Sequence, residues 1–339
     1  MITKRNLIEE LLDRAGLSSE LFTVTDSAGG GNNRILFLEA QGKRYVAKWY
    51  FTHHSDTRDR LRAEYAFLEY AANGGLTSVP KPLACHPEER LALYEYIEGE
   101  KLQPGKVTAR QIEEAADFIL ALNSAERRPF AKQLSEASEA CFSVDDQIVT
   151  IGKRIDRLFT IEATTPENVA ALGHAESLKK GLDEIAYRIR GQKGTEPSIP
   201  LPENQRCVSP SDFGFHNALV RPNGEICFLD FEYAGWDDPA KMACDFFCQP
   251  AIPLDIERFE MFMERSFGFA ADPDALARRA RQMFPLFQIK WVCIMLNEFL
   301  PDSARRRQFG NPEADPEQSK RIQLGKVSKL ITSINFKGR

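Results

Sequence analysis

Residues 207–238 read CVSPSDFGFHNALVRPNGEICFLDFEYAGWDD, and they are the most informative stretch of the chain. Asp212 precedes Asn217 by five positions, and Asp230 follows Asn217 by thirteen, directly after the apolar run ICFL. This spacing fits a loop, a short hairpin and a strand end, so the three side chains can point into one cleft. Phosphoryl transfer needs such a set: one carboxylate orients the attacking hydroxyl, while a carboxamide and a second carboxylate hold magnesium on a nucleotide's phosphates.

The stretch resembles the catalytic region of the aminoglycoside phosphotransferase family, which shares the protein-kinase-like fold with choline kinases. The resemblance implies an α+β, bilobal fold, with an N-terminal antiparallel sheet carrying one helix and a larger, mainly helical C-terminal lobe. It places a nucleotide-binding lobe at residues 1–98 and a catalytic and substrate-binding lobe at residues 99–339. It also implies that Asp212 is the catalytic residue and that Asn217 and Asp230 are the magnesium ligands.

One position departs from the family pattern, and another agrees with the family but differs from protein kinases. Pro210 stands where the family usually has a histidine, two residues before the catalytic aspartate. Asp230 is followed by Phe231 and Glu232, unlike the Asp-Phe-Gly of protein kinases, and this favours a small-molecule substrate. Asp and Asn also favour loops for reasons of turn geometry alone, so the trio has to be judged with the rest of the chain.

The stretch LFTVTDSAGGGNNRILFLEAQGKRYVAKWYF predicts three strands: one before the glycine turn, one that includes Ile35–Leu38, and RYVAKWYF at residues 44–51. A turn at Gln41-Gly42 joins the last two. The first hairpin tip could be only a flexible turn, or a lid whose bare backbone approaches phosphates. Its residues are the expected nucleotide contacts Gly29, Gly30, Gly31 and Asn32. No GxxxxGK[ST] run occurs, which disfavours a P-loop ATPase.

Lys48 lies inside an otherwise apolar strand, where a lysine is costly unless it has an anionic partner or reaches the edge. It resembles the kinase lysine that pairs with nucleotide phosphates and with a helix glutamate. The following helix, predicted over about 57–73, has Glu64 beside its apolar stripe, and Glu64 is the expected partner. A surface glutamate is the alternative interpretation.

The segment LALYEYIEGE resembles the family's connection between lobes. The resemblance implies that adenine bonds backbone groups near Glu95 and Ile97, with Tyr94 at the back of the pocket. Helices are expected further on, beginning at Thr108 with a Thr-x-x-Gln capping box, at Thr165-Pro166, and at Asp272-Pro273, the last running to about Leu300.

Substrate recognition leaves weaker signals. Trp291 and Glu298 are seven apart on the last predicted helix, so on one face, where they could bind an ammonium or simply be a core tryptophan and a rim glutamate. The arginines of two clusters are expected on solvated faces, with a phosphate or carboxylate contact as the alternative. They are Arg278, Arg279, Arg281 and Arg305–Arg307.

Composition limits the class of protein. Hydrophobic residues make up 43% and charged residues 27% of the 339 residues, and the formal net charge is −5, which does not suggest nucleic-acid binding. No apolar run is long enough for a membrane span, and the charged start lacks a signal core, so a cytoplasmic protein is expected. The seven cysteines show no metal pattern and fit buried reduced thiols.

The sequence therefore predicts an ATP- and magnesium-dependent phosphotransferase that acts on a hydroxyl of an aminosugar, a sugar or an amino alcohol. The alternative is a nucleotide-binding pseudokinase that acts as a scaffold. A protein kinase is disfavoured, because Asp-Phe-Glu replaces Asp-Phe-Gly and no Ala-Pro-Glu segment occurs.

Overall fold

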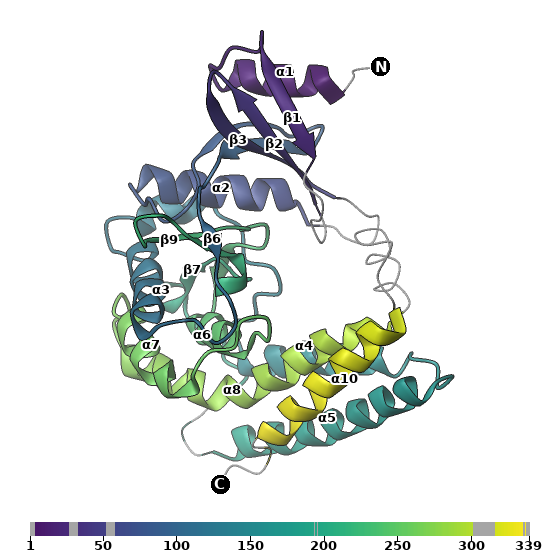
Figure 1. Ribbon diagram of the computed structural model, residues 1–339. Helices are drawn as coiled ribbons and strands as arrows, with labels where there is room; N and C mark the ends of the chain where they lie inside the picture. The colour runs from purple at the N-terminus through teal and green to yellow at the C-terminus, as the bar shows by residue number, and fades with distance from the viewer. Residues whose placement is uncertain are drawn as a thin grey trace. The chain divides into compact units, whose positions relative to one another are not determined.

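The computed structural model describes residues 4–26, 33–51, 58–192, 194, 196–300, 316–334 and 336 (Figure 1). The chain divides into two compact units. The first comprises Met1–Ser138 and Val208–Trp236, and the second comprises Glu139–Cys207 and Asp237–Arg339. The boundary between lobes at residues 98 and 99 stays a prediction.

The first unit contains a five-stranded antiparallel sheet in the order β1-β2-β3-β5-β4. Its strands are β1 (Phe22–Asp26), β2 (Arg34–Ala40), β3 (Lys43–Trp49), β4 (Pro82–His86) and β5 (Leu91–Glu95). The predicted turn between β2 and β3 is confirmed, because Gln41 and Gly42 both have positive φ angles, of 54° and 71°. Positive φ at both central residues gives the turn a twist that matches the flanking strands.

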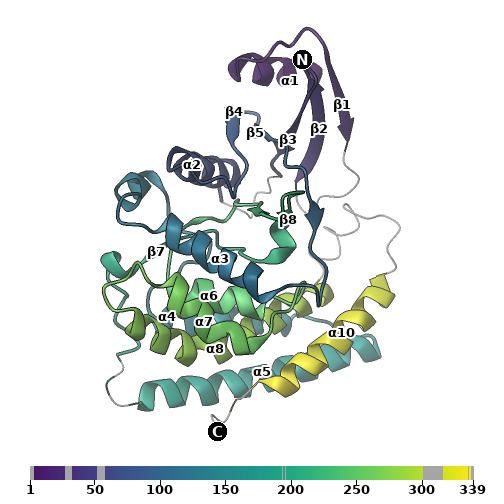
Figure 2. The same cartoon turned by 60° about the vertical axis from the view of Figure 1, so that its left-hand side comes forward.

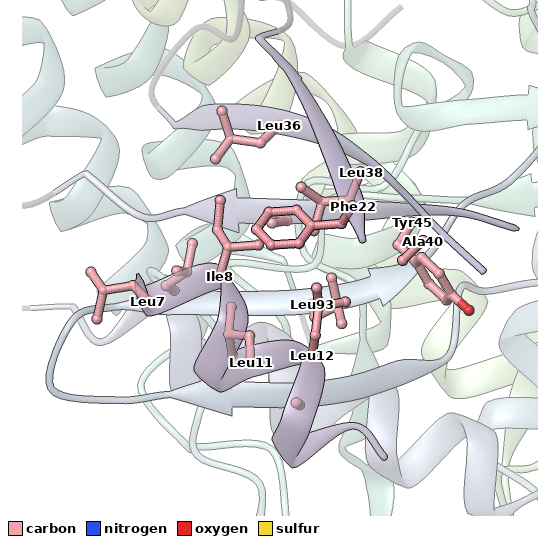
Figure 3. Close-up of a cluster of buried hydrophobic side chains, with 13 residues drawn as sticks. Leu7, Ile8, Leu11, Leu12, Phe22, Leu36, Leu38, Ala40, Tyr45 and Leu93 are labelled. Carbon is pink, nitrogen blue, oxygen red and sulfur yellow. The ribbon is translucent and has the colours of Figure 1, made fainter. Parts of the chain in front are cut away.

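Helix α1 (Lys4–Arg14) packs on this sheet through one apolar face (Figure 3). Leu11 and Leu12 are fully buried, and they meet Leu38 of β2 and Leu93 of β5 in one hydrophobic cluster. Leucines at these positions of an amphipathic helix remove apolar surface from water, which stabilises both the helix and the sheet.

We expect Leu12→Ala to lower the free energy of unfolding by about 2–5 kcal/mol, because it leaves a cavity in this fully buried cluster. Urea denaturation measures the change. Leu21→Ala is the control: Leu21 is 85% exposed, so its truncation should alter stability by less than about 0.5 kcal/mol. Equal effects of the two substitutions would contradict the packing of α1.

Helix α2 (Arg60–Asn73) begins after Asp59, whose side chain accepts from the amide of Arg62, and ends at Gly74 as expected. The Tyr70 hydroxyl donates to the carbonyl oxygen of Leu122 over 2.5 Å. Arg127 donates to the carbonyl oxygens of Gly74 and Ala121, at the C-terminal ends of α2 and of α3 (Ala109–Leu122). The C-terminal ends of the two helices are therefore bonded to each other. The capping box predicted for α3 at Thr108 is confirmed.

A second, three-stranded antiparallel sheet in the first unit has the order β6-β8-β9. Its strands are β6 (Glu100–Lys101), β8 (Ala218–Val220) and β9 (Ile226–Phe228). Where β6 begins, a Cβ on Gly99 would stand 2.8 Å from the carbonyl oxygen of Val220. Only glycine allows the two backbones to approach this closely.

The second unit is mainly helical, and α5 and α10 lie side by side in it (Figure 2). Its helices are α4 (Val144–Leu158), α5 (Pro166–Gly191), α6 (Pro239–Cys248), α7 (Phe259–Ser266), α8 (Pro273–Leu296) and α10 (Pro316–Ser333). Short 3-10 helices occur in both units. They are η1 (Arg128–Gln133), η2 (Glu203–Gln205), η3 (Phe215–Asn217), η4 (Ile256–Arg258) and η5 (Asn297–Phe299). Strands β7 (Cys207–Ser209) and β10 (Gly235–Asp237) lie where the chain passes from one unit to the other.

Among the helices within the described ranges, none combines the length and the apolar character that a membrane crossing requires.

Candidate functional site

The β8–β9 hairpin brings Asn217 and Asp230 together. Asn217 immediately precedes β8, and Asp230 comes two residues after β9. The register pairs Ala218 with Phe228, and the Leu229 amide then donates to the Asn217 carbonyl oxygen over 2.8 Å. The spacing of thirteen residues in the sequence is therefore the length of one tight hairpin and its flanks.

Asp212 lies beside Asn217. The Asn217 side-chain amide donates to the Asp212 carbonyl oxygen over 3.1 Å and to the carboxylate oxygen Oδ2 over 3.4 Å. Nε2 of His216 is 3.3 Å from the other carboxylate oxygen, Oδ1. The trio singled out in the sequence thus lies in one place, and His216 touches it from the same loop.

Lys48 of β3 is nearly buried, and its ammonium faces three carboxylates. Nζ donates to Glu64 Oε2 over 2.7 Å and to Asp230 Oδ1, and it lies 3.9 Å from Glu232 Oε2. Burial alone would lower the pKa of Lys48, but the charges of Glu64, Asp230 and Glu232 outweigh it and hold that pKa above its ordinary value. Lys48 is therefore a fixed positive charge at neutral pH.

Glu64 of α2 faces inward, 4% exposed, and is not the surface glutamate of the alternative interpretation. Besides Lys48, its carboxylate accepts hydrogen bonds from the Tyr50 hydroxyl (2.7 Å) and from the Phe231 amide (3.3 Å). Burial raises the pKa of Glu64 and the charge of Asp230 adds to the rise, while the Lys48 ammonium and the hydrogen bond from Tyr50 oppose it. Such a carboxylate is stable in the interior only because every oxygen has a donor.

Glu232 is a second buried carboxylate, 3% exposed, and the sequence did not predict its two hydrogen-bond partners. Arg60 of α2 donates to its Oε1 over 3.0 Å, and the Asn33 side-chain amide donates to its Oε2 over 2.5 Å. A sequence signal for Arg60 does exist, since it lies four residues before Glu64 and so on the same helical face. Glu232 thereby connects α2, the start of β2 and the segment that carries Asp230.

In the segment 230–232, the two carboxylates face Lys48 and the aromatic ring between them packs in the core. Asp230 has a φ of 66°, in the left-handed region that aspartate and asparagine adopt more readily than most residues. Phe231 stacks on Phe67 of α2, with ring centroids 4.5 Å apart. This stacking holds the backbone so that the carboxylates on both sides of Phe231 reach Lys48.

These polar groups border a cleft of the first unit with a cavity volume of about 560 Å³. Lys48, Glu64, Asn217, Asp230 and Glu232 all line it. Its other walls are largely apolar, as is usual for sites that bind small organic ligands. Those walls include Ile35, Phe37, Val46, Tyr94, Glu95, Tyr96, Ile97, Leu219 and Leu229.

The expected adenine-binding segment, Glu95 and Ile97, therefore lies on the same cleft as Lys48. The Glu95 amide donates to the Lys81 carbonyl oxygen over 2.9 Å, which fixes this wall against the chain entering β4. The predicted glycine contacts lie outside the described residues; they are Gly29, Gly30, Gly31 and Asn32.

The donor set of the cleft fits magnesium. Asn217 and Asp230 offer a carboxamide oxygen and a carboxylate, and the Asp230 side chain is 42% exposed. The described part of the chain contains no group of three or more His, Cys, Asp and Glu side chains arranged for a metal ion. Magnesium in phosphoryl-transfer sites needs fewer protein ligands, because phosphates and water complete its coordination.

Two expectations for the second unit are wrong. Helix α8 ends at Leu296 instead of about Leu300, and Glu298 belongs to η5, so Trp291 and Glu298 do not share one helix. A tighter final turn before Pro301, which cannot continue a helix, accounts for the difference. Arg279 is not on a solvated face, because it donates to buried Asp238 over 2.8 Å.

Two other candidates of the second unit, Arg281 and Trp291, bond to side chains of the same unit. Arg281 pairs with Glu260 at the surface, as expected for a solvated face. Trp291 donates to Asp245, whose carboxylate is also bonded to Lys290. Arg305–Arg307 lie outside the described residues.

The chain is similar to known phosphotransferases. A sequence model of the phosphotransferase enzyme family matches residues 23–268. No curated protein sequence matches. Among solved structures, the chain is similar to a spectinomycin phosphotransferase in complex with ADP and spectinomycin, with a TM-score of 0.66 and 11% identity over 99% of both chains.

Two further solved structures are similar to the chain. An ethanolamine kinase from Plasmodium vivax has a TM-score of 0.59 and 14% identity over 96% of this chain and 89% of the other. The choline kinase LicA from Streptococcus pneumoniae has a TM-score of 0.57 and 15% identity over 96% of this chain and 98% of the other. The protein-kinase-like α+β fold predicted from the sequence is confirmed by these similarities.

Proposed function

Because the chain belongs to the phosphotransferase enzyme family, we propose that it transfers the γ-phosphoryl group of ATP to a hydroxyl group of a small molecule. The observation that carries the proposal is a single cleft in which Lys48, Asn217 and Asp230 converge beside Asp212. A fixed ammonium, two hard oxygen donors and a carboxylate next to them are the groups that phosphoryl transfer requires.

Lys48 is the phosphate-binding residue in this proposal. Glu64 holds its ammonium from behind, over 2.7 Å, so that little conformational freedom is lost when phosphates bind. Magnesium held by Asn217 and Asp230 would neutralise charge on the phosphates. Glu95 and Ile97 would bond the adenine edge through their backbone groups, and the backbone of Gly29–Gly31 and Asn32 would contact the phosphates.

Asp212 is the catalytic residue in this proposal. Its carboxylate accepts a hydrogen bond from the acceptor's hydroxyl and aligns it with the γ-phosphorus. The hydroxyl oxygen forms a bond to that phosphorus while the bond to the β,γ-bridging oxygen breaks. ADP departs with the electron pair of the broken bond, and the hydroxyl proton passes to Asp212.

The acceptor class is an aminosugar, a sugar or an amino alcohol. The solved structures with similar folds include proteins named for spectinomycin, ethanolamine and choline. These three compounds are therefore the first acceptors to test. The cytoplasmic location expected from the sequence stays a prediction.

We expect ATP with magnesium to raise the melting temperature of the protein, because a ligand that binds only the native state stabilises it by mass action. At a hundred times the dissociation constant the stabilisation is about 2.7 kcal/mol. Differential scanning fluorimetry with and without magnesium measures the shift. No shift at millimolar ATP under either condition would contradict nucleotide binding.

A second assay measures ADP release in the presence of ATP, magnesium and one acceptor at a time. The acceptors include spectinomycin, ethanolamine and choline. Acceptor-dependent ADP release identifies a kinase. A thermal shift with ATP but no acceptor-dependent ADP release across aminosugars, sugars and amino alcohols would instead identify the nucleotide-binding scaffold.

A further inference from the structure

Two buried tyrosines stand behind the ion pair of Lys48 and Glu64. Tyr50 directly follows β3, and Tyr94 lies in β5; they are 4% and 3% exposed. The Tyr50 hydroxyl donates to Glu64 Oε2 over 2.7 Å, and the two tyrosine hydroxyl oxygens are 2.6 Å apart. A phenol has one proton, and that of Tyr50 goes to Glu64, so Tyr94 is the donor to Tyr50.

The direction of this hydroxyl chain is fixed at neutral pH. Burial raises the pKa of Tyr50 and of Tyr94 well above its ordinary value, and the nearby charge of Glu64 adds to the rise. Both hydroxyls therefore remain protonated at neutral pH. Tyr94 polarises Tyr50, and Tyr50 donates to the Glu64 carboxylate as part of a connected network.

Tyr50 contacts both members of the ion pair. The Glu64 oxygen that accepts from Tyr50 is the one that accepts from Lys48, so the two donors fix its position together. The Lys48 ammonium also lies 5.1 Å from the centre of the Tyr50 ring, within the range of a cation–π interaction. Glu64 then has three donors, since the Phe231 amide bonds its other oxygen.

Tyr94 connects these hydrogen-bonded hydroxyls to the wall of the cleft, because Tyr94 and Lys48 line the same cavity. The pairing of β3 with β5 sets Val46 opposite Tyr94 and Lys48 opposite Ala92. Tyr94 therefore lies on the same face of the sheet as Lys48 and Tyr50, and its long side chain reaches along the strand to the Tyr50 hydroxyl, 2.6 Å away. The hydrogen bonds from Tyr94 through Tyr50 to Glu64 therefore join the apolar wall of the cleft to its charged end.

We propose that Tyr50 and Tyr94 are positioning residues, which hold Glu64 and through it place Lys48 for the phosphates of the nucleotide. This rests on the proposed function, because only a phosphate-bearing ligand uses the Lys48 ammonium. Were the two hydroxyls only satisfying each other in the core, their removal would cost stability without a preference for phosphate-bearing ligands.

The test compares three single variants, Tyr50→Phe, Tyr94→Phe and Tyr70→Phe. Each removes one hydroxyl and keeps the ring. Tyr70 is the matched control, because it is 2% exposed, lies on the same helix as Glu64, and donates its hydroxyl to a backbone carbonyl away from the ion pair. Isothermal titration with ATP–magnesium and with adenosine separates phosphate-dependent from base-dependent affinity.

Tyr50→Phe should weaken ATP binding about tenfold, because it removes a hydrogen bond to a charged group, and leave adenosine binding within about twofold of the wild-type value. Tyr94→Phe should weaken ATP binding roughly threefold, since it acts through Tyr50. Tyr70→Phe should leave the affinities for both ligands unchanged.

Equal losses for ATP and adenosine, or a Tyr50→Phe variant that matches Tyr70→Phe, would overturn the positioning role. If Tyr50→Phe does not fold, Tyr94→Phe decides by the same comparison. The wild-type titration separates this inference from the proposed function: wild-type protein that fails to bind ATP refutes both, whereas tight ATP binding with unchanged variants refutes only the inference.

Discussion

Asp212→Asn should lower the rate of phosphotransfer about a hundredfold or more, while ATP–magnesium affinity stays within about twofold of the wild-type value. The amide cannot accept the proton of the attacking hydroxyl. It does fit the site, because Asn217 bonds the backbone carbonyl oxygen of residue 212, which the substitution keeps. The measurement is the initial rate of ADP release with saturating acceptor, and slow ATP hydrolysis can stand in for it.

The control for this substitution is Asp183→Asn, which makes the same chemical change at an exposed position of α5. It should keep the wild-type rate. A rate for Asp212→Asn within a few-fold of wild type would refute the catalytic assignment. Loss of magnesium-dependent nucleotide binding in Asp212→Asn would instead exchange its role with that of Asp230.

Asp230→Asn should weaken ATP binding in the presence of magnesium on the order of a hundredfold, because it removes a charge that bonds Lys48 and that would bind the metal. Its affinity measured with a chelator should change far less. Asparagine is the informative substitution, since it tolerates the φ of 66° at this position and adds no backbone strain. ATP is titrated into the wild-type protein and into Asp230→Asn, each with magnesium and with a chelator, and the ratio of the two affinities is compared between the proteins.

A matched control is available near the C-terminal end of α2. Tyr70→Phe alters α2 without touching a carboxylate of the cleft, so it should retain the full magnesium dependence. The metal assignment of Asp230 is wrong if Asp230→Asn binds ATP with the same ratio of affinities, with and without magnesium, as the wild-type protein.

Local features of the fold were predictable from the sequence because their signals lie within a few residues. The Thr108 capping box needs only Gln111, and the turn at Gln41-Gly42 needs only its own φ preferences. The meeting of Asn217 and Asp230 also follows from local spacing, because one hairpin joins them.

Contacts between distant segments were predictable only where the resemblance supplied the partner, as for Lys48 and Glu64. The bond between Arg60 and Glu232 joins residues 172 apart, and no periodicity reports it. Tyr50 had a usable signal, because side chains two apart on an extended segment share a face and Tyr50 follows Lys48 by two. Its bond to Tyr94 depends on the pairing of β3 with β5, which the sequence does not specify.

Helix α2 is bonded to the rest of the first unit at three points along its length. Arg60 bonds Glu232 near its start, Glu64 bonds Lys48 in its middle, and the Gly74 carbonyl oxygen accepts from Arg127 at its end. Enzymes that are switched on by displacing a helix need an element with two arrangements of similar free energy. Bonds along the whole of α2 favour one arrangement over any other. These three bonds therefore oppose any displacement of α2 that would carry Glu64 away from Lys48.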